Sequence, residues 1–329
     1  MKIYFLEKSI PFNANDLDKN TIGGSEKTLI NISKELAKYK ELDVKVFNEN
    51  IAKIKIDNVD WININDFEKY SSPDVLISYS DVNLFNSYKA KKKFLWSHSV
   101  QSFEKFIRKN QFINYLFHKP ILILEGEYHY KTRSILTSFF GKKVLKLAPD
   151  YDFINEKISI DKIPSKNCIF TTRSDRNLDL LLKAWKKVSE NNKDASLMIN
   201  PPYKLNDELI KQNIVLRTKG NKMLLINDLK KSRLMLNPGH KGEVFCLAAE
   251  EARAMCIPIV TLGIGSLYER VIHNKTGFIA KSLDEFINYT NILLNNDELY
   301  IKFRNNLFNL RNIRNYSHVA KDLLNIITI

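Results

Sequence analysis

Short apolar runs alternate with longer segments along the first half of the chain. The runs fall at residues 2–6, 43–47, 74–79, 94–97, 121–124 and 144–147. Between the first two runs, Leu29, Ile32 and Leu36 recur at the spacing of one helix face. Strands that alternate with helical patterns need crossover connections, so the pattern predicts a parallel sheet covered by helices.

The segment at 149–166 interrupts this rhythm, because it carries two prolines, many charges and no clear period. The alternation then restarts. We expect a helix at 177–190, helices from 283 to about 327, and strands at 168–171, 196–199, 214–216, 234–236 and 258–261. The chain therefore predicts two α/β domains with a cleft between them, at 1–150 and 151–310. A C-terminal helix is expected at 311–329, and a return to the first domain is one option for it.

The stretch from Asn237 to Pro258 reads as a strand, a loop, a helix and the entry to another strand. It places Glu243 at the loop tip and Glu251 about two turns into the helix. Ligands of open α/β sheets bind at this rim, and a helix N-terminus offers N–H groups to phosphate. An ordinary amphipathic helix with a solvated acidic face explains the same spacing, so the two glutamates alone do not decide between the readings.

The net charge of +14 allows three kinds of partner: nucleic acid, an anionic membrane surface or phosphorylated small molecules. Abundant Lys, Asn and Ile also suggest compositional drift in an AT-rich genome. The three cysteines have neither zinc-ligand nor disulfide spacing, which favours a reducing, cytosolic setting. The first residues do not resemble a signal peptide, and no apolar run is long enough to span a membrane.

Two loops offer phosphate chemistry. Gly23-Gly24 lies between a strand and a helix, where it is either a simple turn or a close approach to a ligand. Arg173 and Arg176 precede a helix and could clamp a diphosphate, although a solvated loop with an Arg–Asp pair is an equal alternative. A further Gly-rich rim at 263–266 would extend the same edge.

Three other features are weaker. His98 follows a strand and could contact a substrate hydroxyl or phosphate, although a lone histidine is more often structural. Asp150 and Asp152 have the spacing of a metal-diphosphate site but lie in the expected linker, so we favour a structural explanation. The basic, aromatic residues at 88–94 and 103–119 could meet an anionic bilayer or a lipid-linked acceptor, or be a solvated face. Serine-hydrolase, P-loop, zinc-protease and nucleic-acid module signatures are missing.

Taken in order, these pieces resemble the retaining nucleotide-sugar glycosyltransferases of family 4. The family signature E-x-F-x-L-x-x-x-E-A-x-A-x-x-x-P is matched in register by Glu243, Phe245, Leu247, Glu251, Ala252, Ala254 and Pro258. The resemblance extends to Glu269 and Gly277, to a first-domain G-G-x-E loop at 23–26, and to a G-R…K-G loop matched by Arg173 and Arg176. It is good over residues 165–281, moderate over 1–48 and only a pattern between them.

Several positions depart from the family pattern. Thr172 and Asn177 replace the usual glycines around the arginine loop, which is also shorter. The small glycine positions of the signature are occupied by Val244, Cys246 and Cys256. These departures put in doubt how closely phosphate approaches the backbone.

The resemblance implies a GT-B fold, with two Rossmann-like domains whose parallel sheets face a central cleft. The first domain, 1–150, would bind the acceptor, and the second, 151–310, the sugar nucleotide. Glu251 would accept hydrogen bonds from the ribose and Glu243 from the transferred sugar. Arg173 and Arg176 would neutralise the diphosphate, so neither a metal nor a cofactor is implied beyond a UDP- or GDP-sugar substrate.

Backbone N–H groups at Phe245, Cys246 and Leu247, with Gly23 and Gly24, would assist at the phosphates. His98 would touch the sugar or the acceptor. The implied activity is retaining transfer of a hexose to a glycan or lipid-linked acceptor in surface polysaccharide biosynthesis. The protein would act in the cytoplasm, with the inner face of the membrane as a further partner and no nucleic acid bound.

Two alternatives stay open. A GT-B epimerase or phosphorylase is an enzyme alternative, although a phosphorylase should carry a cofactor lysine motif. A basic nucleic-acid or membrane-surface binding protein on a degenerate GT-B scaffold is the alternative outside enzymes, and steeply salt-dependent binding without sugar-nucleotide affinity would identify it.

Overall fold

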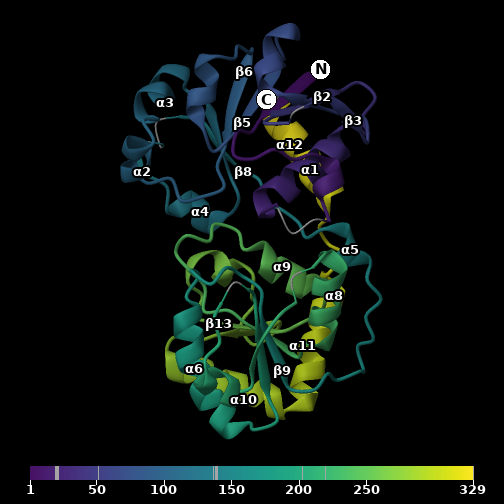
Figure 1. The fold of residues 1–329 in the computed structure, drawn as a ribbon, viewed down its shortest axis with the longest axis vertical. Coiled ribbons are helices and arrows are strands. Elements are labelled where there is room, and N and C mark those ends of the chain that lie inside the picture. The colour runs from purple at the N-terminus through teal and green to yellow at the C-terminus, as the bar shows by residue number, and fades with distance from the viewer. Residues whose placement is uncertain are drawn as a thin grey trace. The chain divides into compact units, whose positions relative to one another are not determined.

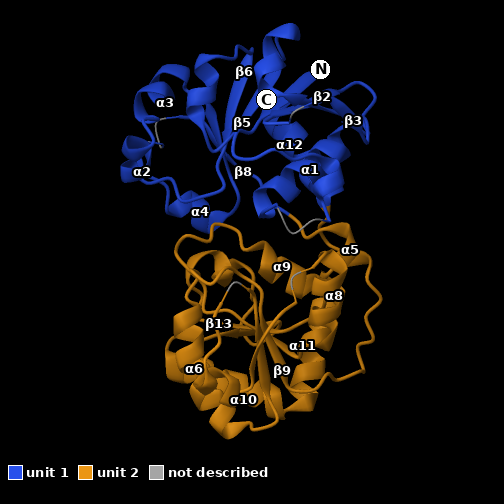
Figure 2. Ribbon diagram, viewed as in Figure 1, with its two compact units in different colours: residues 1–147, 316–329 blue, residues 148–315 orange. Residues whose placement is uncertain are grey.

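The computed structural model describes residues 1–18, 22–50, 52–135, 137, 140–201, 203–218 and 220–328. The chain divides into two compact units, Met1–Leu147 with Tyr316–Ile329, and Ala148–Asn315 (Figures 1 and 2). Each unit holds a sheet of mostly parallel strands, which confirms the predicted α/β class. The first of the two stretches that make up the first unit ends at Leu147. The expected C-terminal segment 311–329 begins in the second unit and continues in the first, and Ile329 lies outside the described residues.

The sheet of the first unit has, among the described residues, eight strands in the order β3-β4-β2-β1-β5-β6-β7-β8. Their bounds are β1 Lys2–Leu6, β2 Asp43–Asn48, β3 Ile54–Ile56, β4 Val59–Asn63, β5 Val75–Tyr79, β6 Lys92–Trp96, β7 Ile121–Leu124 and β8 Lys142–Val144. All neighbours pair in parallel except β3, which is antiparallel to β4. Strands β2 to β4 lie on one side of β1, and β5 to β8 lie on the other side. The order of the strands therefore reverses between β1 and β5.

The helices of the first unit are α1 Gly24–Leu36, α2 Phe103–Arg108, α3 Phe112–His118, α4 Glu127–Lys131 and α12 Tyr316–Thr328, with short 3-10 turns η1 Ala14–Asp16, η2 Ile64–Lys69 and η3 Val82–Asn86. Helix α12 packs against α1, far from it in sequence. The Tyr316 and Thr28 hydroxyls lie 3.4 Å apart, and the Lys92 ammonium donates to the Ile327 carbonyl over 3.4 Å. A lysine at the carbonyl end of a helix is electrostatically favourable.

The sheet of the second unit has, over its described residues, the order β11-β10-β9-β12-β13-β14, and all pairs are parallel. The strands are β9 Asn167–Phe170, β10 Ser196–Ile199, β11 Ile214–Leu216, β12 Leu234–Leu236, β13 Ile259–Thr261 and β14 Gly277–Ile279. Here the reversal falls between β9 and β12, because β10 lies on one side of β9 and β12 on the other.

Helices cover both faces of this second sheet (Figure 1). They are α5 Tyr151–Asn155, α6 Leu178–Asn191, α7 Asp207–Lys211, α8 Lys222–Lys231, α9 Leu247–Ala254, α10 Leu283–Asn295 and α11 Asp297–Leu310, with the 3-10 turn η5 Gly265–Glu269. Alternating strand residues separate the two cores: Cys168 and Phe170 pack with α6 and α10, whereas Ile169 packs with α8 and α9. The period of two along each strand therefore builds two hydrophobic layers from one short run.

Several elements differ from the sequence prediction, among them the following three. The hairpin of β3 and β4 was not predicted; its turn residues Asp57 and Asn58 both have positive φ, 51° and 63°, as a two-residue type I′ turn requires. The run at 144–147 lies mostly after its strand, because β8 ends at Val144. The expected linker 149–166 contains α5, which begins at a capping aspartate, Asp150.

Candidate functional site

The carboxyl ends of β9 and β12 lie side by side at the reversal point of the second sheet. Two loops leave from there, one at 171–177 towards α6 and one at 237–246 towards α9. Crevices outside such reversal points are the usual ligand sites of open α/β sheets. The two loops carry half of the predicted site residues, namely Arg173, Arg176, Glu243, Phe245 and Cys246.

The loop after β12 is held by its first residues. Asn237 is fully buried, and its Oδ1 accepts a hydrogen bond from the Gly239 N–H over 2.9 Å. Gly239 has φ +89°, and a Cβ there would lie 2.2 Å from the Ile264 carbonyl oxygen, so only glycine fits. The loop after β13 is tied on through the Ser266 N–H, which donates to the Glu243 carbonyl over 3.0 Å.

Arg176 and His240 join the two loops. The Arg176 Nη1 donates to His240 Nδ1 over 2.8 Å, and the Gly242 N–H donates to the same nitrogen over 2.9 Å. Because Nδ1 accepts twice, the neutral ring carries its proton on Nε2. Burial and the Arg176 charge lower the pKa of His240, which keeps it neutral.

Asn177 links the same loops through its side chain. It precedes α6 with φ 61°, in the left-handed region that asparagine tolerates better than most residues. Its Nδ2 donates to the Gly239 carbonyl over 2.6 Å. An asparagine therefore occupies this position, where the resembled family usually has glycine, and adds a cross-loop bond.

Glu243 is the most perturbed carboxyl group of the two loops. Burial raises its pKa to about 7, although Arg176 and the Cys246 side chain act in the opposite direction. Its Oε2 is buried and has no hydrogen-bond partner among the described residues. A carboxyl group that titrates near neutral pH, close to a cation, is typical of ligand and catalytic sites.

The residue that precedes helix α9 is its N-cap Cys246, which has φ 59° and makes no side-chain capping bond. The first N–H groups of a helix have no partner within the helix and carry its positive dipole end. Beneath this turn, the buried Arg270 stacks on the Phe245 ring at 4.1 Å and pairs with Glu250 at 2.8 Å. Arg270 thus stabilises the start of α9 through its contacts with Phe245 and Glu250.

The remaining predicted residues of the second unit are spread out. Arg173 is mostly exposed and pairs with Asp175 at 2.8 Å, which is the plainer of the two alternatives for this loop. Glu251 lies in the second turn of α9 and is partly exposed, and Leu247 is the first residue of that helix.

The structure also shows what the closely spaced Asp150 and Asp152 contact. Both carboxylates contact the buried Lys222 ammonium, at 2.9 and 2.6 Å. A lysine thus occupies the position between the two carboxylates, in agreement with the structural explanation. Among the described residues, no group of three or more His, Cys, Asp or Glu side chains is arranged to hold a metal.

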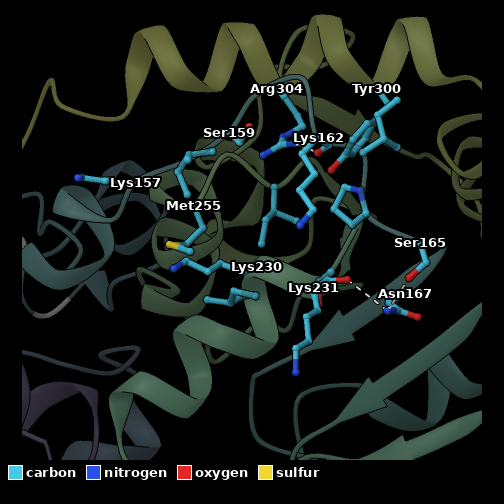
Figure 3. A pocket seen from close by; sticks show the side chains of 16 residues that line it. Lys157, Ser159, Lys162, Ser165, Asn167, Lys230, Lys231, Met255, Tyr300 and Arg304 are labelled. Atoms are coloured by element: carbon cyan, nitrogen blue, oxygen red, sulfur yellow. Dashed lines mark hydrogen bonds between the residues drawn. The ribbon is translucent and has the colours of Figure 1, made fainter.

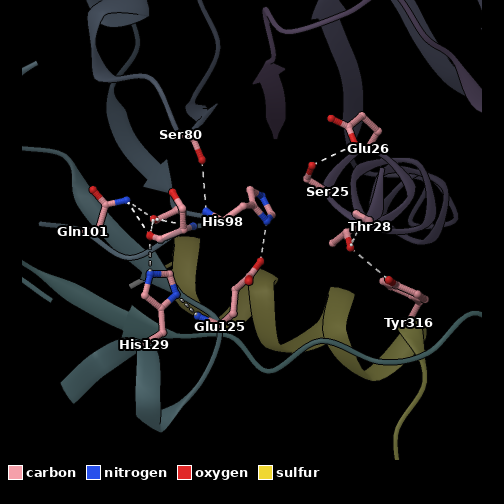
Figure 4. A network of polar contacts seen from close by, with 12 residues as sticks. Ser25, Glu26, Thr28, Ser80, His98, Gln101, Glu125, His129 and Tyr316 are labelled. Atoms are coloured by element: carbon pink, nitrogen blue, oxygen red, sulfur yellow. Dashed lines mark hydrogen bonds and ion pairs between the residues drawn. The ribbon is translucent and has the colours of Figure 1, made fainter. Parts of the chain in front are cut away.

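The other predicted residues lie in the first unit. Gly23 and Gly24 are exposed at the start of α1. His98 follows β6, and its Nδ1 lies 2.6 Å from the Glu125 carboxylate (Figure 4). Sequence reasoning missed Glu125, although it follows β7 just as His98 follows β6, and side chains that follow neighbouring parallel strands meet at one sheet edge.

Sequence reasoning also missed His240, Asn237 and the brace from Arg270. A signal was present for the first two, because both lie in the N-P-G-H stretch that directly follows β12. Arg270 gives no such signal, since its partners come from other parts of the chain.

A separate cavity of about 560 Å³ lies elsewhere in the second unit (Figure 3). Its lining includes Lys157, Lys162, Lys231 and Arg304, and it borders the amino ends of β9 and β13. It is therefore at the other edge of the sheet from the candidate site.

Comparison with known proteins bears on one part of the chain and on the fold. Residues 168–309 match the family model described as glycosyl transferases group 1, which is less than half of the chain. No curated protein sequence matches the chain. WaaG, "a glycosyltransferase involved in lipopolysaccharide biosynthesis", has a TM-score of 0.70 at 14% identity, with all of both chains covered. HepE from Anabaena, solved with UDP and glucose, has a TM-score of 0.72 at 14% identity, covering 100% of this chain and 99% of HepE.

TarM from S. aureus, solved with UDP, fondaparinux and α-GlcNAc-glycerol, has a TM-score of 0.64 at 15% identity. The match covers 84% of this chain, which spans 62% of TarM. The fold is that of the GT-B glycosyltransferases. The family match concerns residues 168–309, and the likeness to these solved structures concerns the fold.

Proposed function

We propose that this protein is a retaining, metal-independent glycosyltransferase that moves a hexose from a UDP- or GDP-sugar to a glycan or lipid-linked acceptor in surface polysaccharide biosynthesis. The observation that carries the proposal is the meeting of Arg176, His240 and Glu243 at the β9–β12 reversal point, beside the start of α9. A cation, helix N–H groups and a carboxyl group there match the parts of a sugar nucleotide.

The chemistry follows from these groups. Arg176 and the first N–H groups of α9 stabilise the diphosphate as negative charge grows on the leaving group. His240 holds the Arg176 guanidinium in place. Glu243 binds hydroxyls of the transferred sugar, and Glu251 those of the ribose, because carboxylates accept hydrogen bonds from both. Arg173 is close in sequence and adds positive charge from the exposed side.

Nucleotide binding tests the proposal most directly. A thermal-shift panel of UDP-, GDP- and ADP-sugars should show stabilisation by one base above the others. Calorimetry with the matching nucleoside diphosphate should give about ten- to a hundredfold weaker binding for Arg176→Ala, the range expected for loss of a charge-assisted hydrogen bond. Lys183→Ala, on the exposed side of α6, is the matched control. Full diphosphate affinity in Arg176→Ala would contradict the assignment.

The stereochemistry and the acceptor need product analysis. Proton NMR of the glycosidic bond should show the anomeric configuration of the donor retained. Activity should persist after treatment with a chelator. Inversion, or loss of activity that Mg²⁺ restores, would overturn those two parts of the proposal while leaving glycosyl transfer intact.

We also propose that the protein works in the cytoplasm at an anionic membrane surface. No helix in the described part of the chain has the length and apolar character to cross a bilayer. In the first unit, however, α2 and α3 expose large apolar side chains, with Ile113 and Phe117 each 77% exposed. Arg108, Lys109 and Lys119 lie beside them in sequence and are also exposed. Apolar residues among cations suit the interface of an anionic bilayer.

A further inference from the structure

The carboxyl edge of the first sheet gathers buried polar atoms without partners. Glu7 follows β1, Tyr79 ends β5, Trp96 ends β6 and His98 follows it. Their atoms Glu7 Oε2, Tyr79 Oη, Trp96 Nε1 and His98 Nε2 are buried without a hydrogen-bond partner among the described residues. Glu7 and Tyr79 are each only 6% exposed. A buried polar atom without a partner destabilises the folded protein. Four of them on three neighbouring strands therefore need an explanation.

His98 is held in one orientation. Its ring stacks on Tyr79 at 4.5 Å and on Trp96 at 5.3 Å. Its Nδ1 meets the Glu125 carboxylate at 2.6 Å (Figure 4). The backbone N–H of His98 donates to the Ser80 Oγ over 3.2 Å and fixes the main chain that carries the ring. The ring therefore cannot turn to satisfy Nε2 within the first unit, and Nε2 is left for another molecule.

The hydrogen-bonding character of these atoms is mixed. The Trp96 N–H can only donate, an ionised Glu7 can only accept, and the Tyr79 hydroxyl can do both. Sugar hydroxyls donate and accept in the same way. An anion, in contrast, would need donors alone.

The local charge also disfavours an anion. Burial raises the pKa of Tyr79 well above its usual value, and the charges of Glu125, Glu26 and Glu7 act in the same direction. Glu26 also raises the pKa of Glu7, after the larger effect of burial. Lys105 is a cation of this network, and its ammonium contacts the Ser99 hydroxyl. An otherwise basic protein thus presents an acidic edge here.

His129 is a second histidine of this network. Its Nδ1 accepts from the Glu125 N–H over 3.2 Å, and its Nε2 donates to the Ser99 carbonyl over 3.0 Å. Burial, its largest cause, lowers the pKa of His129 to about 4, so the ring is neutral at physiological pH. It adds no positive charge beside Glu125.

We propose that this edge binds an uncharged or amine-bearing sugar ring of the substrate and rejects a ring with a phosphate or carboxylate at that position. The inference rests on the proposed glycosyl transfer and narrows its substrate class. The ring could come from the donor or from the acceptor, since both present the same hydroxyls.

Saturation-transfer NMR on the full chain tests it, with methyl glucoside, glucosamine, glucose 6-phosphate and glucuronate as probes. We expect binding of the first two and none of the last two. Tyr79→Phe and Glu7→Gln should weaken methyl glucoside binding by roughly tenfold, whereas Tyr39→Phe in the same unit and Glu190→Gln, exposed on α6 of the other, should not change it. Tyr79→Phe should also raise the melting temperature without ligand, because it removes an unpaired buried hydroxyl.

Calorimetry distinguishes the two sources of the ring. If the donor supplies it, Tyr79→Phe weakens UDP-sugar or GDP-sugar binding but not binding of the bare nucleoside diphosphate. If the acceptor supplies it, both affinities are unchanged and methyl glucoside still binds beside a bound sugar nucleotide. Equal binding of glucose 6-phosphate, no binding of neutral sugars, or full binding by Tyr79→Phe would each overturn the proposal. Loss of nucleotide affinity in Arg176→Ala is independent of all three, so failure here leaves the proposed activity standing.

Discussion

Among the non-glycine residues of the second unit with left-handed backbone are three that belong to the family motifs or the loop beside them. Asn177, Cys246 and Cys256 have φ of 61°, 59° and 56°. All three stand where the resembled family usually has glycine. The departures change the side chain and keep the backbone conformation, so the loops around the candidate site keep the turn that glycine would give.

Asn177 offers a test of how this conformation is maintained. Asn177→Ala should cost about 2 kcal/mol of unfolding free energy, because it combines left-handed strain with loss of the bond to the Gly239 carbonyl. Asn177→Gly should cost about 1 kcal/mol, since only the bond is lost. Urea unfolding followed by the Trp185 fluorescence, in a background with Trp61 and Trp96 changed to Phe, reports on the second unit alone. Equal losses in both variants would show that strain does not contribute.

Glu243 should make stability depend on pH. Its folded pKa of about 7 lies above the ordinary value of 4.5, so the folded state binds the proton more tightly than the unfolded state does. The wild type should therefore gain stability, relative to Glu243→Gln, as the pH falls from about 8 to about 5. Melting temperatures of the two proteins across this range measure the effect. A constant difference would mean that the carboxyl group is not desolvated in the folded protein.

Helix ends explain why some elements follow from the sequence and others do not. Helix α9 ends in a Schellman motif: the Ile257 N–H donates to the Ala252 carbonyl and the Cys256 N–H to the Arg253 carbonyl, over 2.9 and 3.0 Å. Glycine is the usual residue after the end of such a helix, and this chain has Cys256 there. The end of the helix was visible only because Pro258 and an apolar run follow.

Long or strongly periodic elements could be predicted, and short ones that depend on distant partners could not. Residues 178–191 form α6 because one face carries Leu178, Leu181, Trp185 and Val188, all buried. Helix α5 has five residues and no such face, and its carbonyl end is satisfied from outside. The Arg311 guanidinium donates to the carbonyls of Phe153, Ile154 and Glu156 over 2.9, 2.7 and 2.9 Å.

The same limit applies to the candidate site. Glu243 and Arg176 could be predicted because each lies in a loop after a predicted strand and each matches a motif of the resembled family. The pairing of Arg176 with His240 was not, because 64 residues separate them and only the sheet order brings them together.

Removing the Arg311 contact should loosen the segment that leads into the second unit. Arg311→Ala should cost about 3 kcal/mol, because three carbonyls lose a charged donor in a buried setting. Limited proteolysis should then cut within residues 148–166 faster than in the wild type. Lys302→Ala, on the exposed side of α11, is the matched control and should change neither measurement. Equal cleavage in both variants would contradict the role of Arg311.

The whole molecule should bind anionic membranes through α2 and α3. Replacing Ile113 and Phe117 with Asp should lower affinity for vesicles that contain phosphatidylglycerol by about tenfold or more, since apolar burial is lost and like charges are added. Ile210→Asp in the second unit, where Ile210 is 56% exposed, controls for a general loss of surface apolarity. Vesicle cosedimentation at low and high salt measures the apolar and the electrostatic contributions to binding. Equal binding to uncharged vesicles would show that the cations take no part.

The return of α12 to the first unit has a consequence for biosynthesis. Residues 316–328 complete the first unit by packing on α1, yet the ribosome makes them after the whole of residues 148–315. Domains usually fold in the order of synthesis. Here the second unit emerges from the ribosome with all of its residues before the first unit does. The first unit, whose residues 1–147 are made earliest, is therefore the later of the two to reach its final structure.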